Sequence, residues 1–363
     1  MRRGEEGDDG SIVNLDGTII DKYSEGRNFV INMNKKKLGY LIQVIFIILL
    51  IAWGVWKQHN RVFEVKKSDF LMDTVFEIEA SAKVKDLESI VDSAFSLAGR
   101  YERELSYYDE GSIISAINGA EADSVAITGE IYNMLEAGEY FYQMTGGRYD
   151  LSIGRLSEIW DIEQGTIPDS DQVAEALRYI GFNQIRYNDK NIIKPQGMKI
   201  NLGSIAKGYI VDKIVEYFRG KGVSGMLINA GGDIRLEGMG EVLIGVQHPR
   251  GDRSEIIDKI RIKDQAVVTS GDYERYFEVD GVRYHHIINA LTGYPARECV
   301  SVTAISETAE RADGLSTAAF LLPPEDAVIL ADKLENACVI IYYLDEAGEL
   351  AKMISSGAEQ YLE

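Results

Sequence analysis

The feature that most constrains this chain is an uninterrupted apolar run near its N-terminus. Residues 38–56 read LGYLIQVIFIILLIAWGVW and contain no charged side chain. In a helix these 19 residues extend roughly 28 Å, close to the hydrocarbon thickness of a bilayer. Tyr40, Trp53 and Trp56 stand near the ends, where aromatic side chains favour the membrane interface. The run therefore predicts a transmembrane anchor over residues 38–56.

Two other interpretations of this run are a buried core helix and a cleaved signal peptide. The lysines at 35–37 and Lys57 bracket the run tightly, which disfavours a core helix. The run is also longer than the apolar part of a signal peptide, about 7–15 residues, and no small-residue cleavage site follows it. Four cations flank each end, so the positive-inside rule is nearly tied. The compact lysine triplet at 35–37 favours a cytoplasmic N-terminus.

Charge and composition divide the rest of the chain. Residues 1–34 hold four cations and seven anions, and we expect a flexible acidic tail there. The net charge of the chain is -20. Since the tail carries about −3 and the four lysines beside the anchor +4, about −21 remains for residues 58–363. So acidic a chain is a poor nucleic-acid binder, because phosphates need clustered cations. No linker interrupts residues 62–363, which we expect to form one large domain, either undivided or with two lobes.

The hydrophobic spacing after the anchor predicts interspersed strands and helices. Residues 76–80 alternate as a half-buried strand does, and residues 86–105 have apolar side chains at helical spacing. Further predicted helices cover 127–145, 171–180, 313–320 and 325–334; further predicted strands cover 242–247, 260–262, 266–269, 300–305, 337–344 and 350–354. The fold class is therefore α+β, or mixed α/β. Cys299 and Cys338 can form one disulfide, or stay buried and reduced, which their apolar surroundings favour.

A segment at residues 199–209 predicts a phosphate cradle. It reads KINLGSIAKGY, where a short strand meets Gly203 and Ser204 can cap a helix running to Arg219. Such a helix start offers free N–H groups to an anion. Lys207 in the first turn opposes the helix dipole unless an anion binds there. The alternative is an ordinary capped helix with a solvated lysine.

Three other segments carry candidate chemistry. Asp313 and Thr317 share a helical face, and their oxygens suit Mg²⁺ or Ca²⁺; alternatively, Asp313 only stabilises a helix N-terminus. Residues 227–233 run from an apolar strand through paired glycines to Asp233, which suits close backbone approach or a plain turn. Residues 267–295 are rich in polar and aromatic groups, and a proton-transfer role for His286 is plausible among them.

Taken together, these segments resemble the ApbE family of FAD:protein FMN transferases. The resemblance spans residues 65–345 in eight ordered blocks: MDT at 72–74, SYY at 106–108 with Ser112 and Asn118, GRYD at 147–150 through Trp160, 201–208 with Asp212, NAGGD at 229–233, TSGD at 269–272, 286–293 and 312–317. It implies a two-lobed, T-fold-like mixed α/β domain with an FAD site between the lobes. Family members use Mg²⁺ to split FAD and pass FMN to a Ser or Thr hydroxyl of a partner protein, releasing AMP.

The resemblance also assigns roles to residues. Ser204, Asp313 and Thr317 should supply metal oxygens, to Mg²⁺ or alternatively to Ca²⁺ or Mn²⁺. His286 matches the candidate base, and Asp313 serves catalysis through the metal. The flavin nucleotide should be lined by Met72, Tyr108, Arg148, Tyr149, Asp150, Asn201 and Lys207. The family often has Asp at the position of Asn201 and Asp-Pro at that of Asn289-Ala290, so the FAD contact and the surroundings of the base can differ here.

Three functions are compatible with these predicted residues. The first is an anchored transferase that flavinylates a membrane-associated redox protein or subunit, with its catalytic domain outside the cytoplasm, as is common among members. The second is an FAD pyrophosphatase, in which water replaces the protein hydroxyl and FMN and AMP are released. The third is a non-catalytic flavin-binding protein, which the intact set of oxygen ligands disfavours.

Overall fold

The structure is a computed structural model of the chain, and it describes residues 12–13, 19–20, 35–121 and 124–363. The chain divides into two compact units, one ending at Asn60 and the other beginning at Arg61. The acidic tail expected over residues 1–34 lies outside the described residues, apart from the antiparallel pair β1 (Ile12–Val13) and β2 (Ile19–Ile20).

The first unit contains the apolar helix α1 (Lys35–His59). Within it, Leu38–His59 has a mean hydropathy of 2.5 and is long and apolar enough to cross a membrane. None of the side chains of that stretch is buried. The helix continues past residue 56, and Lys57 and His59 in its last turn favour the negative end of the helix dipole.

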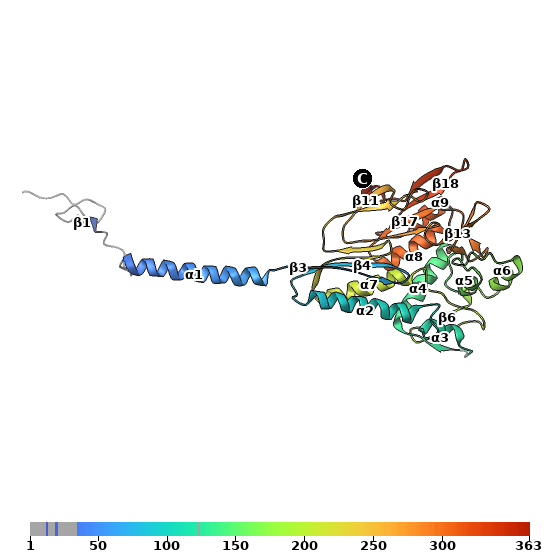
Figure 1. The fold of residues 1–363 in the computed structure, drawn as a ribbon, viewed down its shortest axis with the longest axis horizontal. Coiled ribbons are helices and arrows are strands. Elements are labelled where there is room, and N and C mark those ends of the chain that lie inside the picture. The colour runs from blue at the N-terminus through green and yellow to red at the C-terminus, as the bar shows by residue number, and fades with distance from the viewer. Residues whose placement is uncertain (1–11, 14–18, 21–34, 122–123) are drawn as a thin grey trace, which may run out of the picture. The chain divides into compact units, whose positions relative to one another are not determined.

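The second unit is an α+β domain (Figure 1). Its helices are α2 (Leu87–Leu105), α3 (Ile113–Gly119), α4 (Gly129–Met144), α5 (Gly154–Ile159), α6 (Ser170–Leu177), α7 (Ala206–Gly220), α8 (Ala309–Phe320), α9 (Pro324–Asp332) and the 3₁₀ turns η1 (Phe182–Gln184) and η2 (Glu359–Tyr361). Its central sheet has eight antiparallel strands, in the order β19 (Leu350–Ile354), β18 (Cys338–Leu344), β17 (Ser301–Ser306), β12 (Ala266–Gly271), β9 (Asp233–Glu237), β8 (Val223–Ala230), β4 (Thr74–Ala82) and β3 (Phe63–Leu71).

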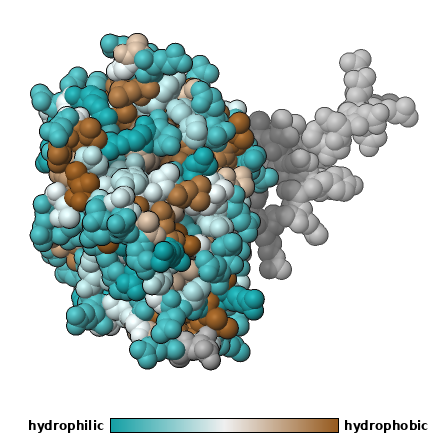
Figure 2. Space-filling model, turned by 90° about the vertical axis from the view of Figure 1, so that its right-hand side faces the viewer, coloured by the Kyte–Doolittle hydropathy of each residue, from teal (hydrophilic) through white to brown (hydrophobic). Residues whose placement is uncertain are grey.

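The domain also contains smaller sheets. They are the hairpins β10 (Val242–Gln247) with β11 (Ile256–Ile262), β13 (Tyr276–Val279) with β14 (Val282–His285), and β15 (Ile288–Asn289) with β16 (Tyr294–Pro295), and the three strands β5 (Val125–Ala126), β7 (Asn191–Ile193) and β6 (Arg186–Tyr187). Figure 2 shows the end of the domain that carries α5 and α6, where apolar residues form several separate patches.

The central sheet is buried on both faces at β17 and β18, and strand alternation explains how. In β18, Val339 and Ile341 join the larger core, which α2, α7, α8 and α9 cover. The intervening Cys338, Ile340 and Tyr342 face a second core that includes side chains of β10 and β11. A strand buried on both faces reads as a continuous apolar run, as residues 338–342 do. Cys299 and Cys338 are buried and not bonded to each other, as predicted.

The structure confirms most predicted helices and strands and corrects two details. No strand runs into Gly203; residues 199–203 contribute only an isolated bridge between Ile153 and Lys199. The helix predicted to start at Asp313 starts one turn earlier, at Ala309, because the Thr308 side chain accepts from the Arg311 N–H and caps it. Asp313 is therefore not at a helix N-terminus.

Candidate active site

The candidate site is built on the close contact of α7 with α8. The Gly208 N–H donates to Asp313 Oδ2 over 3.0 Å, and a Cβ at position 208 would lie 2.3 Å from the Ala309 carbonyl oxygen. Only glycine permits that approach. One turn along, the Asp212 carboxylate accepts from the first two N–H groups of α8, at 3.0 and 2.9 Å. Hydrogen bonds thus join α7 and α8 at both ends of their contact. The bond from the Gly208 N–H holds the Asp313 side chain in place.

A charge cluster surrounds the Asp313 carboxylate. The turn Gly231–Gly232, with φ of 68° and 106°, joins β8 to β9 and brings in Asp233, whose Oδ2 lies 2.7 Å from Lys207 Nζ. Burial and the nearby Asp233 raise the pKa of Asp313, and Lys207 opposes that shift. Burial raises the pKa of Asp233 despite Lys207. Burial disfavours the Lys207 cation, but the carboxylates of Asp233 and Asp313 outweigh it and raise the Lys207 pKa.

This cluster explains how a lysine can stand in the first turn of α7. The residue is neither a free solvated lysine nor in conflict with the helix start, because Asp233 supplies the compensating anion. Its side chain remains 38% exposed, so a ligand phosphate can still reach it. The glycine turn fits both of its expected interpretations: it is a plain hairpin turn, and a Cβ at Gly231 would lie 2.1 Å from Thr74 Oγ1, so the backbone approaches its neighbour closely.

Of the predicted metal residues, Ser204 precedes α7, whereas Asp313 and Thr317 stand one turn apart on α8, and Ser204 is not a helix cap. The residue before α7 is Ile205, and no side chain caps that helix. Ser204 Oγ instead donates to the Tyr149 hydroxyl over 2.9 Å. Burial raises the pKa of Tyr149, the hydrogen bond with Ser204 opposes that shift, and the charge on Asp313 adds to it. Thr317 is one turn further along α8, 3.3 Å from Ser270 Oγ.

This donor set fits a hard divalent cation that is shared with a substrate. Within the described part of the chain, no group of three His, Cys, Asp or Glu side chains could hold a metal. An all-protein cage like that of a Zn²⁺ or strong Ca²⁺ site is therefore not built there. One carboxylate with hydroxyl oxygens matches how Mg²⁺ is usually held, through few protein ligands plus phosphate oxygens.

The predicted flavin-lining residues fall into three groups. Tyr149 and Lys207 belong to the cluster around Asp313, whereas Met72 and Tyr108 lie on turns. Met72 has φ 53° at the β3–β4 turn and donates its N–H to Glu102. Tyr108 is 73% exposed, so its ring is available for stacking. Burial raises the pKa of Tyr108, the charge on Arg275 opposes that shift, and the charges of Glu163, Asp161 and Asp73 add to it.

Three other predicted residues are engaged by the fold itself. The Asp150 carboxylate accepts from the N–H and hydroxyl of Ser152 and from the Phe182 N–H. The Asn201 side chain accepts from Gly203 N–H and donates to Ser157. Arg148 donates to the Thr145 carbonyl oxygen, and its own carbonyl accepts from Ala290 N–H. These contacts hold the loops in position.

His286 follows the β13–β14 hairpin and is exposed. Its Nδ1 lies 3.3 Å from the Arg275 carbonyl oxygen. Surrounding protein, together with the charges of His285 and Arg275, lowers the pKa of His286 to about 3. The ring is therefore neutral at pH 7 and able to accept a proton, although so low a pKa makes a weak base.

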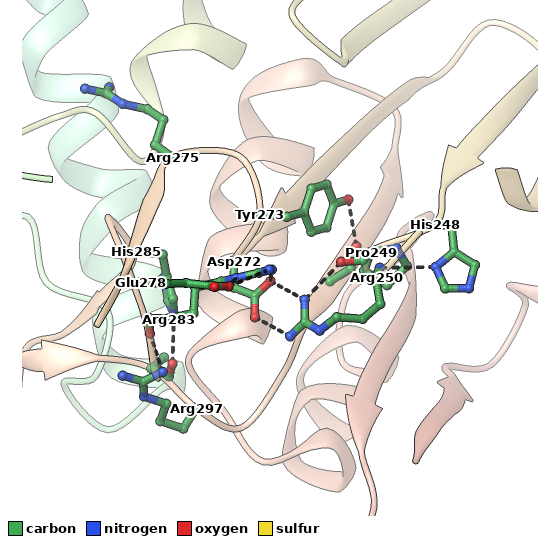
Figure 3. A network of polar contacts seen from close by, with 12 residues as sticks. His248, Pro249, Arg250, Asp272, Tyr273, Arg275, Glu278, Arg283, His285 and Arg297 are labelled. Carbon is green, nitrogen blue, oxygen red and sulfur yellow. Dashed lines mark hydrogen bonds and ion pairs between the residues drawn. The ribbon is translucent and has the colours of Figure 1, made fainter. Parts of the chain in front are cut away.

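An ion-pair network holds this hairpin. Figure 3 shows Arg250 and Arg283 converging on Asp272. Asp272 Oδ1 accepts from Arg250 over 2.7 Å and from Arg283 over 3.1 Å, and Asp272 Oδ2 accepts from Arg250 over 2.6 Å. Asp272 is only 7% exposed, so both pairs are well shielded from water. Arg283 stands on β14, three residues before His286, and the network therefore positions the candidate base.

Sequence reasoning assigned no role to Asp212, Asp233 or Asp272. Each is now seen to fix a site element, through α8, Lys207 or β14 respectively. Asp233 and Asp272 lie in two of the candidate segments, 227–233 and 267–295, so their acidic side chains alone could have marked them as candidates. Lys207 is more than 22 residues from Asp233, and Arg250 and Arg283 are 22 and 11 residues from Asp272. No rule of local sequence spacing predicts these ion pairs.

Comparisons with known proteins agree in one family. The ApbE family model matches residues 72–341. An FAD:protein FMN transferase of Treponema pallidum (strain Nichols) is 29% identical over 83% of this chain and 91% of its own. One from Klebsiella pneumoniae (strain 342) is 33% identical over 66% of this chain and 77% of its own. The crystal structure of an ApbE protein from Thermotoga maritima covers 83% of this chain and 100% of its own, with 34% identity and a TM-score of 0.75.

Proposed function

Because the chain belongs to the ApbE family, we propose that it is a flavin transferase that uses Mg²⁺ to move FMN from FAD to a Ser or Thr hydroxyl of an acceptor protein. The observation that carries the proposal is the pair of helices α7 and α8, joined by the Gly208–Asp313 hydrogen bond, which brings the Asp313 carboxylate into the charge cluster of Lys207 and Asp233. That arrangement suits a pyrophosphate and a hard cation.

The reaction balances without a further reagent. The acceptor oxygen forms a bond to the FMN phosphorus of FAD, the bond from that phosphorus to the bridging oxygen breaks, and AMP leaves with that oxygen. The hydroxyl proton passes to a base, for which we propose His286 because its ring is neutral at pH 7. Bound Mg²⁺ supplies charge neutralisation at the pyrophosphate. Asp313, Ser204 and Thr317 would hold it, and Lys207 would contact a phosphate oxygen.

The remaining predicted residues have binding roles in this proposal. Tyr108 offers an exposed ring face for the flavin or adenine, and Met72 lies on the β3–β4 turn. Tyr149 orients Ser204 through its hydroxyl. Arg148, Asp150 and Asn201 shape the loops that surround the nucleotide.

We further propose that α1 anchors the enzyme in the cell membrane with the N-terminus in the cytoplasm and the domain outside. Its exposed apolar surface needs an apolar environment, and the lysine triplet at 35–37 favours the inner side. An acceptor held in the same membrane, such as a redox subunit, is then the natural partner. Protease added to intact cells tests the topology: it should digest the domain, whereas digestion only after lysis contradicts it.

One experiment tests the reaction. Full-length protein in detergent is incubated with FAD, Mg²⁺ and a candidate acceptor, and the acceptor is weighed by mass spectrometry. We expect a covalent FMN adduct that disappears without Mg²⁺ and in Asp313→Asn, and persists in Asp326→Asn, an exposed carboxylate of α9. Release of FMN and AMP without adduct would indicate a pyrophosphatase, and unaltered FAD a binding protein; either result overturns the proposal.

A further inference from the structure

A cavity separate from the candidate active site is lined by residues of α7, α8 and β9. Its volume is about 460 Å³, large enough for an amino acid or a somewhat larger molecule. Tyr209, Asp212 and Lys213 of α7 line it, together with Arg235 of β9 and Glu310 of α8. None of the residues assigned above to metal, flavin or proton transfer lines this cavity.

Unpartnered polar atoms gather at this cavity. Among the described residues, five buried side-chain atoms have no hydrogen-bond partner, and three of them, Tyr209 Oη, Arg235 Nε and Glu310 Oε1, belong to residues that line it. Tyr209 and Arg235 are only 3% and 5% exposed. A buried polar atom without a partner costs about 1–3 kcal/mol. Three at one cavity indicate a site built to receive partners from a ligand.

The charges at the cavity show the kind of ligand. Its cations are already matched: Lys213 lies 2.9 Å from Glu216, and Arg219 and Arg235 both bind Glu237, at 2.6 and 2.9 Å.

Its acids are less well matched. Asp212 is held by two backbone N–H groups, and the structure gives Glu310 no cationic partner. Burial and the nearby Asp212 raise the pKa of Glu310 to about 7, and the charge on Lys213, which pairs with Glu216, only partly opposes that shift. A ligand cation at this position would remove the conflict.

The unpartnered donors add a second requirement. Arg235 Nε can only donate, and the Tyr209 hydroxyl can donate or accept, so the ligand needs an acceptor oxygen besides its cation. We propose that this cavity binds a basic amino acid, with its cationic group against Glu310 and Asp212 and its carboxylate against Arg235 and Tyr209. A metal ion is not the expected occupant, because no three acidic, His or Cys side chains of the described residues are close enough to share one.

Calorimetric titration of the full-length protein with L-arginine and L-lysine tests the site, with L-glutamate of similar size and opposite charge as the control ligand. We expect binding of at least one basic amino acid and none of L-glutamate. Glu310→Gln should weaken binding at least tenfold, and Tyr209→Phe, which removes only the unpartnered oxygen, about threefold or more. Glu335→Gln, an exposed glutamate after α9, should leave binding unchanged.

Each opposite result overturns the proposal. These are no heat with either basic amino acid, equal binding by wild type and Glu310→Gln, or equal binding of L-glutamate. A loss of folding in a variant is recognised by circular dichroism, and Tyr209→Phe then decides because it removes a single atom. The titrations contain no FAD, Mg²⁺ or acceptor, so a failure of the proposed transferase activity would not affect their outcome.

Discussion

At the scale of single residues, the site depends on buried charges that balance one another. Lys207 neutralises Asp233, which is only 2% exposed. Removing one member of such a pair leaves the other buried without a counter-ion, which is costly. The same residues therefore serve stability and ligand binding together, and substitutions separate the two roles.

Lys207→Met should destabilise the domain, more at high than at low pH. Without the lysine, the already raised pKa of Asp233 rises further. A raised folded pKa means that stability is kept while Asp233 is protonated and is lost as pH rises and the buried group ionises. We expect a loss of roughly 1–3 kcal/mol in the free energy of unfolding at pH 8 and less at pH 5. Urea denaturation measures both.

Lys213→Met is the matched control for this prediction. Lys213 is on the same helix but pairs with Glu216, which is 59% exposed, and such pairs contribute little. An equal loss in both variants, or a loss that does not grow with pH, contradicts the argument.

Asp313→Asn should make the metal-free protein more stable at pH 8 while abolishing FMN transfer. Burial and Asp233 raise the pKa of Asp313, so the folded state holds this proton to higher pH than the unfolded state does. Stability associated with this group is thus present at low pH and lost as pH rises. Asn is neutral at every pH and can still accept from the Gly208 N–H. The gain at pH 8 should be on the order of 1–3 kcal/mol, shrinking at pH 5.

Added Mg²⁺ supplies the check on that reasoning. If Asp313 binds the cation, Mg²⁺ should stabilise wild type at pH 8 relative to EDTA and leave Asp313→Asn unchanged. If Asp313→Asn is instead less stable than wild type at pH 8, the argument is contradicted. That result would show that Lys207 stabilises the ionised Asp313 carboxylate enough for it to favour folding.

At the scale of secondary-structure elements, the contact of α7 with α8 is the most demanding. Gly208→Ala places a Cβ about 2.3 Å from the Ala309 carbonyl oxygen, so the helices must move apart. The Gly208–Asp313 hydrogen bond lengthens with them. We expect a loss of roughly 1–3 kcal/mol in stability and a clear loss of Mg²⁺-dependent transfer, measured by thermal unfolding and adduct mass. Gly220→Ala, at the open end of the same helix, should be harmless; equal effects of the two would contradict the close-contact argument.

Asp272→Asn should loosen the β13–β14 hairpin that precedes His286. The amide cannot neutralise Arg250 and Arg283, which both bind the carboxylate. We expect roughly 1–3 kcal/mol lower stability, faster amide hydrogen exchange over residues 276–285, and a fall in kcat larger than the rise in KM. Glu163→Gln is the control, because its pair with Arg275 is exposed. Unchanged exchange in the hairpin would separate Asp272 from the position of His286.

Elements with a strong local pattern could be predicted from the sequence, and elements fixed by distant partners could not. The spacing of apolar residues over 86–105 predicted α2 almost to the residue. The start of α8 was placed too late because its cap, Thr308, precedes the conspicuous Asp313. The pairing of β9 with β12 across the middle of the sheet has no local signal, since β10 and β11 intervene in the chain.

The candidate site divides in the same way. Residues on one helical face, such as Asp313 and Thr317, could be grouped from their spacing. The partnership of Lys207 with Asp233 depends on a hairpin turn reaching a helix, which spacing does not show. Likewise, Ser204 was read as a cap because of its residue type, whereas the fold uses its hydroxyl on Tyr149.

At the scale of the whole molecule, an acidic domain is joined to an apolar helix. Residues 61–363 form their own compact unit and carry about −21 of the charge. So acidic a domain is repelled by anionic lipid and cannot stay at a membrane by electrostatic attraction. Only Asn60, Arg61 and Val62 separate α1 from β3. The helix is therefore the expected source of membrane attachment, and its removal should have a defined effect.

Residues 61–363 expressed alone should be soluble and should transfer FMN to a water-soluble acceptor peptide within about twofold of the full-length rate. Transfer to an acceptor embedded in vesicles should fall by at least tenfold, because the anchor raises the effective concentration of enzyme at the acceptor. Replacing residues 38–56 by a leucine-rich span of equal length should restore it, since the anchor acts through hydrophobicity and length. A truncated protein that still sediments with vesicles would reveal a second membrane contact within the domain. A truncated protein that serves the embedded acceptor at the full rate would show that anchoring does not determine which acceptor is modified.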